Sequence, residues 1–400
     1  MPDIPVGSQI FDLAFHPSHS TVYTGLLTGQ IKAFTYDEQG QHQQSFSVRP
    51  SKRSCRCLTL DEDGSKLWTG GKAKAIFTID TVTGTVCETR KDAHESPINR
   101  MKHLMPHMFS TGDDDGVVKL WDPRKADVIR THTHHFDFIS DFLWLEDKKQ
   151  LITSSGDGTL SVIDVRGKKT EPFAQSEDQE DELLSIVAIK SGSKVVVGTQ
   201  SGILSIFNRS HGWADCVDRV PGHPQSIDAL CSLPSSYPSS HSTVLTGSSD
   251  GLLRAVQLFP TKLLGVVADH GSFPIERIAI DFGGEGRWVG SAGHEDTLKM
   301  TDLKDVFEDE DDAVAEQVET EVDTCSDQGD KDGVACDNDQ NPGESNESLP
   351  VIEASDDEEA QDSDTPKENK RKRKGDKDLT GKRKKGRNEI DAEPSFFTGL

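Results

Sequence analysis

The sequence contains few apolar and aromatic residues and has no segment typical of a membrane anchor. Hydrophobic residues make up 33% of the 400 residues and aromatic residues 6%, which is low for a chain that folds as one compact globule. We therefore expect part of the chain to lie outside any core. No apolar run approaches the roughly 20 residues that a membrane helix needs, and the N-terminus has no basic-then-apolar leader. These absences favour an intracellular protein without a membrane partner.

Motifs of enzymes and metal sites are also missing. We find no Gly-rich phosphate loop, no nucleophile elbow and no His cluster with metal-ligand spacing. None of the seven cysteines forms a C-x-x-C pair, and Cys55 and Cys57 are expected to be two small buried thiols of one strand. Their odd number fits a reducing compartment. We predict a non-enzyme with no cofactor, no metal and no small-molecule substrate.

One pattern recurs along the first three quarters of the chain. It consists of a small residue pair, two variable residues, a turn that resembles Asp-Gly, and alternating apolar positions that end in an aromatic residue or Asp. The clearest copy occupies residues 111–122, and other strong copies begin at Thr153 and Thr246. Glycine tolerates a positive φ and Asp can bond its own backbone, so Asp-Gly between alternating apolar runs predicts a tight β-hairpin.

The spacing of these copies predicts the fold. The turn position falls at residues 29, 74, 116, 158, 202, 251 and 296, and a WD40 blade repeats at about 40–45 residues. Residues 1–307 are therefore predicted to form an all-β, seven-bladed WD40 β-propeller. The last copy ends at Asp302, which leaves little chain for a fourth strand, and an open sheet edge invites aggregation. We predict that an N-terminal strand near residues 4–6 closes the ring.

A histidine precedes four of the copies by a similar distance. His94, His135, His223 and His270 each lie four or five residues before an isoleucine, which resembles the Gly-His half of the WD signature. In that signature a buried His joins a Ser or Thr, the turn Asp and the Trp in a hydrogen-bonded network. The predicted members are His94, Ser110 or Thr111, Asp115, Trp121, Asp157, His223 and Asp250. We interpret them as structural, because a catalytic His-Asp-Ser set would need exposure.

Opposite charges separate along the remaining chain. Residues 308–364 contain 23 Asp and Glu and one Lys, whereas residues 365–388 contain 12 Lys and Arg and 3 Asp and Glu. The acidic segment has too little apolar surface to offset the entropy of ordering, so we predict a disordered C-terminal tail that begins with an acidic linker. Ser355 and Ser363 precede acidic residues and are candidate phosphorylation sites. An unmodified solubilising stretch is the alternative.

Two basic clusters follow the acidic linker, with a spacing that resembles a bipartite nuclear import signal. They comprise Lys370, Arg371, Lys372, Arg373, Lys374, Lys382, Arg383, Lys384, Lys385 and Arg387. We expect an import receptor to bind them and to direct the protein to the nucleus and nucleolus. Such a run can also contact RNA phosphates non-specifically. A purely solvated charge run is the alternative.

The last segment, residues 389–400, changes character again. Phe396, Phe397 and Leu400 form an apolar patch in a polar tail. Disordered tails seldom keep adjacent aromatic residues without burying them somewhere, so we predict a short docking motif. The alternative is a chance cluster.

Several non-consensus stretches together resemble the WD repeat-containing protein 55 family, including its fungal counterparts. They are residues 11–17 (Phe-Asp-Leu-Ala-Phe-His-Pro), 121–125 (Trp-Asp-Pro-Arg-Lys), 246–251 (Thr-Gly-Ser-Ser-Asp-Gly), 291–294 (Ser-Ala-Gly-His), and Phe396-Phe397 with Gly399-Leu400. This resemblance implies a nucleolar protein needed for ribosomal RNA production and ribosome assembly. We therefore expect a non-catalytic scaffold whose partners are proteins, in particular pre-ribosomal assembly factors.

An alternative function depends on residues 121–124. Trp121-Asp122-Pro123-Arg124 resembles the box with which some propellers dock the adaptor of a cullin-type ubiquitin ligase. The chain would then be a substrate receptor. The blade already explains the Trp and the Asp, so Arg124 alone supports this hypothesis.

Direct RNA binding by the propeller is also open. Two small basic groups lie in predicted connections or outer strands: Lys52, Arg53 and Arg56, and Arg166, Lys168 and Lys169. The negative charge balance of residues 1–307 argues against a broad RNA-binding face.

Overall fold

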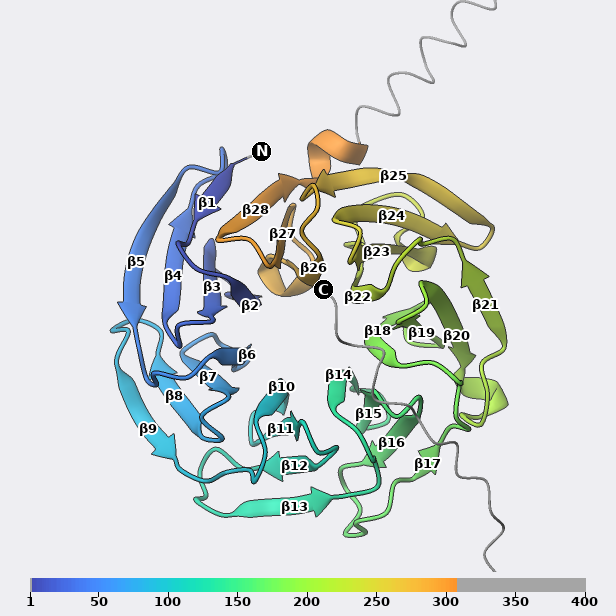
Figure 1. Ribbon diagram of the computed structural model, residues 1–400, viewed down its shortest axis with the longest axis horizontal. Coiled ribbons are helices and arrows are strands. Elements are labelled where there is room, and N and C mark those ends of the chain that lie inside the picture. Colours follow the sequence, from blue (N-terminus) through green and yellow to red (C-terminus); the bar gives the residue numbers. More distant parts are fainter. Residues whose placement is uncertain (1, 308–400) are drawn as a thin grey trace, which may run out of the picture. The chain divides into compact units, whose positions relative to one another are not determined.

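The computed structural model describes residues 2–307, which contain 28 β-strands, three short 3-10 helices and a helical turn at residues 303–307. Within this part of the chain the strands form seven four-stranded antiparallel sheets arranged around a common axis (Figure 1). The prediction of an all-β, seven-bladed propeller is therefore confirmed. The acidic segment 308–364, the basic segment 365–388 and the aromatic segment 389–400 lie outside the described residues, as do Ser355 and Ser363.

Each sheet is one blade, and its first strand lies nearest the axis (Figure 1). Blades 1 to 4 contain, in order, β2 (Ile10–Phe15), β3 (Thr21–Leu26), β4 (Ile31–Tyr36), β5 (His42–Val48); β6 (Cys55–Leu60), β7 (Lys66–Gly71), β8 (Ile76–Asp80), β9 (Val86–Arg90); β10 (Ile98–Met105), β11 (Met108–Asp113), β12 (Val118–Trp121), β13 (Val128–His132); β14 (Ile139–Leu145), β15 (Gln150–Ser155), β16 (Leu160–Asp164), β17 (Ala174–Gln175).

Blades 5 to 7 follow the same plan, and the first strand of the chain belongs to the last blade. They contain β18 (Leu183–Ile189), β19 (Lys194–Thr199), β20 (Ile203–Asn208), β21 (Asp218–Pro221); β22 (Ile227–Ser232), β23 (Thr243–Ser248), β24 (Leu252–Leu258), β25 (Thr261–Asp269); β26 (Ile275–Ile280), β27 (Trp288–Gly293), β28 (Thr297–Asp302) and β1 (Asp3–Pro5). The 3-10 helices are η1 (Arg209–His211), η2 (Ser240–Ser242) and η3 (Phe282–Gly284).

The predicted turns lie between the second and third strands of the blades. Six of the seven turn positions have a positive φ, from 60° at Lys74 to 85° at Gly251. This backbone conformation suits glycine and explains why the turn residue is glycine in five copies. The seventh position, Asp296, does not have a positive φ.

The N-terminal strand closes the ring, as predicted. β1 pairs antiparallel with β28, with Ile4 opposite Leu298, and the amide of Val6 donates to the carbonyl oxygen of Asp296 at 2.8 Å. Ile4 is fully buried and packs in the core that blades 7 and 1 share. The N-terminal strand is thus joined to the last blade by both main-chain hydrogen bonds and apolar contacts.

A glycine in the second strand of five blades allows the next blade to pack closely. A Cβ on Gly112 would lie 2.5 Å from Ile139 Cγ2, and a Cβ on Gly247 would lie 2.7 Å from Ile275 Cγ2. In both pairs the isoleucine begins the first strand of the following blade. The Thr-Gly pair of the sequence repeat is therefore a packing requirement between blades.

We predict that Gly112→Ala destabilises the propeller, because the new methyl group would overlap Ile139. Overpacking of a close-packed core costs about 1–3 kcal/mol, which urea unfolding would measure. Gly265→Ala is the matched control: Gly265 also lies in a strand, and a Cβ there meets no atom within 4 Å. Equal effects of the two substitutions would contradict this explanation.

Candidate functional site

A β-bulge interrupts the first strand of every blade at the same position. In blade 1, Ile10 pairs with Leu26 and Asp12 pairs with Gly25, so Phe11 has no residue directly opposite. The same register shift produces an extra residue in the other six blades: Arg56, Asn99, Ser140, Leu184, Asp228 and Glu276. Bulges change the direction of a side chain and often lie beside functional sites.

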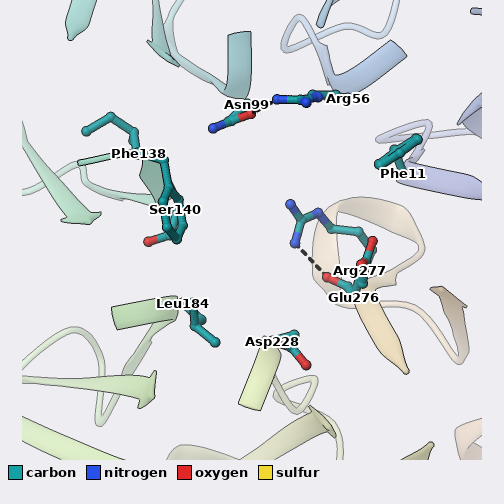
Figure 2. A pocket seen from close by; sticks show the side chains of 10 residues that line it. Phe11, Arg56, Asn99, Phe138, Ser140, Leu184, Asp228, Glu276 and Arg277 are labelled. Atoms are coloured by element: carbon teal, nitrogen blue, oxygen red, sulfur yellow. Dashed lines mark hydrogen bonds between the residues drawn. The ribbon is translucent and has the colours of Figure 1, made fainter. Parts of the chain in front are cut away.

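The seven bulge residues line one cavity of about 280 Å³ (Figure 2). Phe138, Ile139 and Arg277 complete its wall. Because the bulges lie at the start of the first strands, the cavity is on the side of the loops that connect successive blades. We call this cavity the mouth, and we call the side with the connecting loops the mouth face. Since no two bulge residues are the same, the mouth combines apolar, amide, cationic and anionic groups.

A layer of buried ion pairs lies directly below the mouth. Arg100 Nη2 is 3.2 Å from Asp141 Oδ1 and its Nη1 is 3.5 Å from Asp12 Oδ1, while Arg277 Nε is 3.6 Å from the same Asp12 oxygen. Asp12 also accepts the amide hydrogen of Leu58 at 2.7 Å. Burial raises the pKa of Asp12, although Arg100 and Arg277 oppose this effect. These contacts connect blades 1, 2, 3, 4 and 7.

The predicted hydrogen-bonded network is present in blade 3. His94 Nδ1 lies 2.7 Å from Asp113 Oδ2 and His94 Nε2 lies 2.6 Å from Thr111 Oγ1. The indole N–H of Trp121 donates to the same Thr111 oxygen at 2.8 Å. His94, Thr111 and Trp121 are buried, so substrate has no access to this set. Their arrangement supports the structural interpretation.

The carboxylate of this network is Asp113, and the prediction of Asp115 was wrong. Asp113 ends β11, and its Oδ1 also accepts the amide hydrogens of Asp115 and Val117 at 3.1 and 2.8 Å. Asp115 is exposed in the turn itself. The sequence offers three consecutive Asp residues, 113–115, and gives no local signal for which one faces the histidine.

The predicted members in the other blades have different partners. Asp157 Oδ2 lies 2.9 Å from His135 Nδ1, as expected for a network residue. His223 Nε2 lies 2.8 Å from Thr246 Oγ1. Asp250 does not bond to His223; instead it accepts two hydrogen bonds from the guanidinium of Arg254 at 3.0 and 2.6 Å. The placement of Asp250 in a histidine network was therefore wrong, because a nearby arginine competes for its carboxylate.

Arg124 is 61% exposed at its side chain, as a docking residue must be. Its guanidinium, however, faces Asp122, with Nε–Oδ1 and Nη2–Oδ2 distances of 3.0 and 2.9 Å. These hydrogen bonds hold the pKa of Asp122 well below its usual range. Part of the hydrogen-bonding capacity of Arg124 is thus used within its own turn.

The first of the two predicted basic groups lies beside the mouth. Arg56 is one of the bulge residues, and it bonds to Asn99 and Asp114 at 2.7 and 3.0 Å. Lys52 and Arg53 are exposed in the loop before β6. Lys168 and Lys169 are exposed in the loop between β16 and β17, on the opposite side of the propeller. The two groups therefore do not form one basic surface.

Sequence reasoning missed the ring of bulge residues. The signal was present, because each first strand begins with Ile, Leu or Cys followed by a variable residue. It could not be interpreted without the pairing register, which depends on contacts between strands. Within residues 2–307, no three His, Cys, Asp or Glu side chains group as metal ligands. The described helices include none with the length and apolarity needed to span a membrane.

We predict that Asp113→Ala destabilises the propeller much more than Asp115→Ala. The first substitution removes the acceptor for His94 and for two turn amides, and an unsatisfied buried donor costs about 1–3 kcal/mol. Asp115 is exposed, so its loss should change stability by about 0.5 kcal/mol or less. Urea unfolding of the two variants would measure both changes. A larger effect at Asp115 would instead support Asp115 as the carboxylate of the His94 network.

A second prediction concerns acid sensitivity. Burial, with a contribution from Arg254, lowers the pKa of His223 to about 4, whereas an unfolded histidine has a pKa of about 6.5. The unfolded chain therefore takes up a proton that the folded chain excludes, and stability is lost as the pH falls from about 6.5 towards 4. His223→Gln should lose less stability than the wild type between pH 7 and pH 5 in urea unfolding. His211→Gln, at an exposed position, should behave as the wild type.

Comparison with known proteins agrees with this architecture. The profile of the WDR55 family matches residues 1–306. WD repeat-containing protein JIP5 of Laccaria bicolor is 58% identical over 100% of both chains. The protein of the same name from Coprinopsis cinerea is 64% identical over 77% of this chain and 75% of its own.

A mammalian relative extends the similarity beyond fungi. WD repeat-containing protein 55 of Rattus norvegicus is 33% identical over 77% of this chain and 78% of its own. The matched profile spans the closing strand β1 and all seven blades. The chain therefore belongs to the WDR55 family of WD-repeat proteins.

Proposed function

We propose that this protein is a non-catalytic interaction scaffold of the nucleolus that supports ribosomal RNA processing and ribosome biogenesis. The scaffold part rests on the propeller, a fold that presents loops from many blades on one surface, and on membership of the WDR55 family. The nucleolar part rests on the family resemblance and on the basic clusters of the sequence. The proposed partners are proteins, in particular pre-ribosomal assembly factors.

One observation carries the scaffold proposal. Seven blades built on one repeat place seven different side chains at the same bulge position, around a single cavity. Ring closure and core packing do not require such variety at positions that, except for Ser140, are only half-buried. A surface that recognises one asymmetric partner does require it, because specificity depends on a small number of well-placed polar and apolar groups.

The charge pattern of the tail sequence supports the proposed location. Residues 365–388 contain 12 Lys and Arg, and a dense cationic run of this kind suits both an import receptor and the phosphates of RNA. We therefore assign nuclear and nucleolar targeting to this segment and protein binding to the propeller. Non-specific RNA contact by the tail would add affinity for the same compartment.

The second candidate function is that of a substrate receptor of a cullin-type ubiquitin ligase. The observation in its favour is the exposed Arg124 in the Trp121-Asp122-Pro123-Arg124 box. The observation against it is the pair of hydrogen bonds that turns Arg124 towards Asp122. We rank it second because the blade explains every other residue of the box.

Imaging of fluorescent fusions in growing cells tests the proposed location. The full chain should concentrate in nucleoli, whereas a chain that ends at Asp364 should not. A full-length variant with Ser at the ten basic positions of the two clusters should also fail to accumulate in nucleoli, because it lacks the cationic run. A chain that lacks only residues 389–400 is the matched control and should remain nucleolar.

Two outcomes would reject the proposal. Nucleolar accumulation of a chain without the basic clusters would show that they are not the targeting signal. A full chain that stays in the cytoplasm would remove the ribosomal context altogether. The ligase hypothesis would then take first place, and capture of the adaptor by the wild type but not by Arg124→Ala would be the deciding observation.

A further inference from the structure

The mouth face has charged surfaces of opposite sign on opposite sides of the mouth. Lys52 and Arg53 lie in the loop before β6, and Lys72 and Lys74 lie in the turn between β7 and β8. The amide of Lys72 donates to the carbonyl oxygen of Ser54 at 3.1 Å, which holds the loop and the turn together. All four cationic side chains are exposed. We call Lys52, Arg53, Lys72 and Lys74 the basic patch.

The cations of the basic patch are not neutralised by acidic side chains, although the ammonium of Lys74 donates to the carbonyl oxygen of Glu95 at 2.5 Å. Among residues 2–307, none of the four forms an ion pair. Two other exposed cations, Arg124 and Arg166, are by contrast paired with an acidic residue of their own turn. The basic patch therefore retains its charge for a partner.

The acidic counterpart lies three blades further around the ring. The loop between β17 and β18 contains Glu177, Asp178, Glu180, Asp181 and Glu182, and all of these except Asp181 are exposed. We call these five residues the acidic loop. It leads directly into Leu184, the bulge residue of blade 5. The loop with Lys52 and Arg53 likewise leads into Arg56, the bulge residue of blade 2. Arg56 and Leu184 lie on opposite sides of the mouth in Figure 2.

Between these two surfaces the wall of the mouth carries three apolar side chains, which lie on different sides of it (Figure 2). Phe11, Phe138 and Leu184 line the cavity, and each of them is only partly buried. Their exposed area would be removed from water by a ligand side chain, at about 25 cal/mol per Å² of apolar surface. A cavity of about 280 Å³ is large enough for one aromatic side chain.

The mouth also contains a cation with spare hydrogen-bonding capacity. Arg277 Nη1 donates to the carbonyl oxygen of Glu276 at 2.6 Å. Its buried Nε has no hydrogen-bond partner among the described residues, and the nearest carboxylate, that of Asp12, is 3.6 Å away. A buried donor without a partner is costly, and the positive charge of Arg277 at the wall of the mouth would attract a ligand oxygen.

We propose that the mouth face binds an extended peptide of a partner protein, with an apolar, preferably aromatic, side chain in the mouth. An acidic run on one side of this residue lies on the basic patch, and a basic run on the other side lies on the acidic loop. This proposal deepens the scaffold function proposed above and rests on it. Nucleic acid fits less well, because a polyanion that covers the basic patch would also meet Asp228, Glu276 and the acidic loop.

Fluorescence anisotropy with the full chain tests this proposal. The probe is a labelled 13-residue peptide with four Asp or Glu at one end, a central Phe between Gly-Ser spacers, and four Lys or Arg at the other end. We expect saturable binding that weakens at least about tenfold when the central Phe becomes Ser, since this change removes the apolar anchor at constant charge. The Ser peptide also measures any charge-driven contact with the tail, which both peptides share.

Matched variants of the protein locate the binding site. Lys52→Glu with Arg53→Glu reverses the charge of the basic patch and should weaken binding about tenfold or more. Lys168→Glu with Lys169→Glu makes the same change at exposed positions on the opposite side and should leave the affinity within about twofold. Leu184→Asp should also weaken binding. Circular dichroism should give the same thermal midpoint for each charge-reversal variant and the wild type.

Three results would overturn the proposal. The first is that the Phe peptide shows no saturable binding, and the second is that the two charge-reversal variants lose affinity equally. The third is that a single-stranded RNA oligonucleotide binds more tightly than the peptide, displaces it, and also loses affinity when Lys52→Glu and Arg53→Glu are introduced. The last result would assign the face to RNA. Because the assay uses purified protein, its failure is distinguishable from a failure of nucleolar targeting in cells.

Discussion

The pairing of β1 with β28 is the interaction on which the remaining architecture depends. It joins the N-terminal strand to the last blade, with Ile4 opposite Leu298 in a buried core. Only a closed ring brings blade 7 beside blade 1, and the mouth needs both, since it combines Phe11 of blade 1 with Glu276 and Arg277 of blade 7. The ion pair between Asp12 and Arg277 crosses the same junction. Closure therefore determines the site as well as stability.

A second constraint connects the core to the surface. In five blades a glycine of the second strand makes room for the residue that begins the next blade, and the bulge follows directly after that residue. One local geometry thus fixes the distance between blades and also directs a variable side chain towards the axis. Because the core determines the position of the bulge but not the identity of its residue, the seven bulge positions can vary while the fold persists.

The sequence predicted the features that repeat and missed those that depend on pairing between distant strands. The turn spacing gave the seven blades, and the short last repeat gave the closing strand. The residues of the third copy predicted His94, Thr111 and Trp121 as members of the hydrogen-bonded network. Because three Asp residues are adjacent there, the sequence did not show that Asp113 is the one that bonds to the histidine. The carboxylate of Asp250 pairs with Arg254, four residues further on, and not with His223 as the local pattern predicted. The bulges, and with them the mouth, follow from register, which no single repeat encodes.

Cross-linking mass spectrometry of the full chain, isolated with its partners from cell extracts, tests the central claim that the mouth face is where this scaffold binds proteins. The account predicts that amine-reactive cross-links to partner proteins concentrate on Lys52, Lys72 and Lys74. Cross-links confined to Lys148 and Lys168, which are exposed on the opposite side, would contradict it and would assign partner binding to the other face of the propeller.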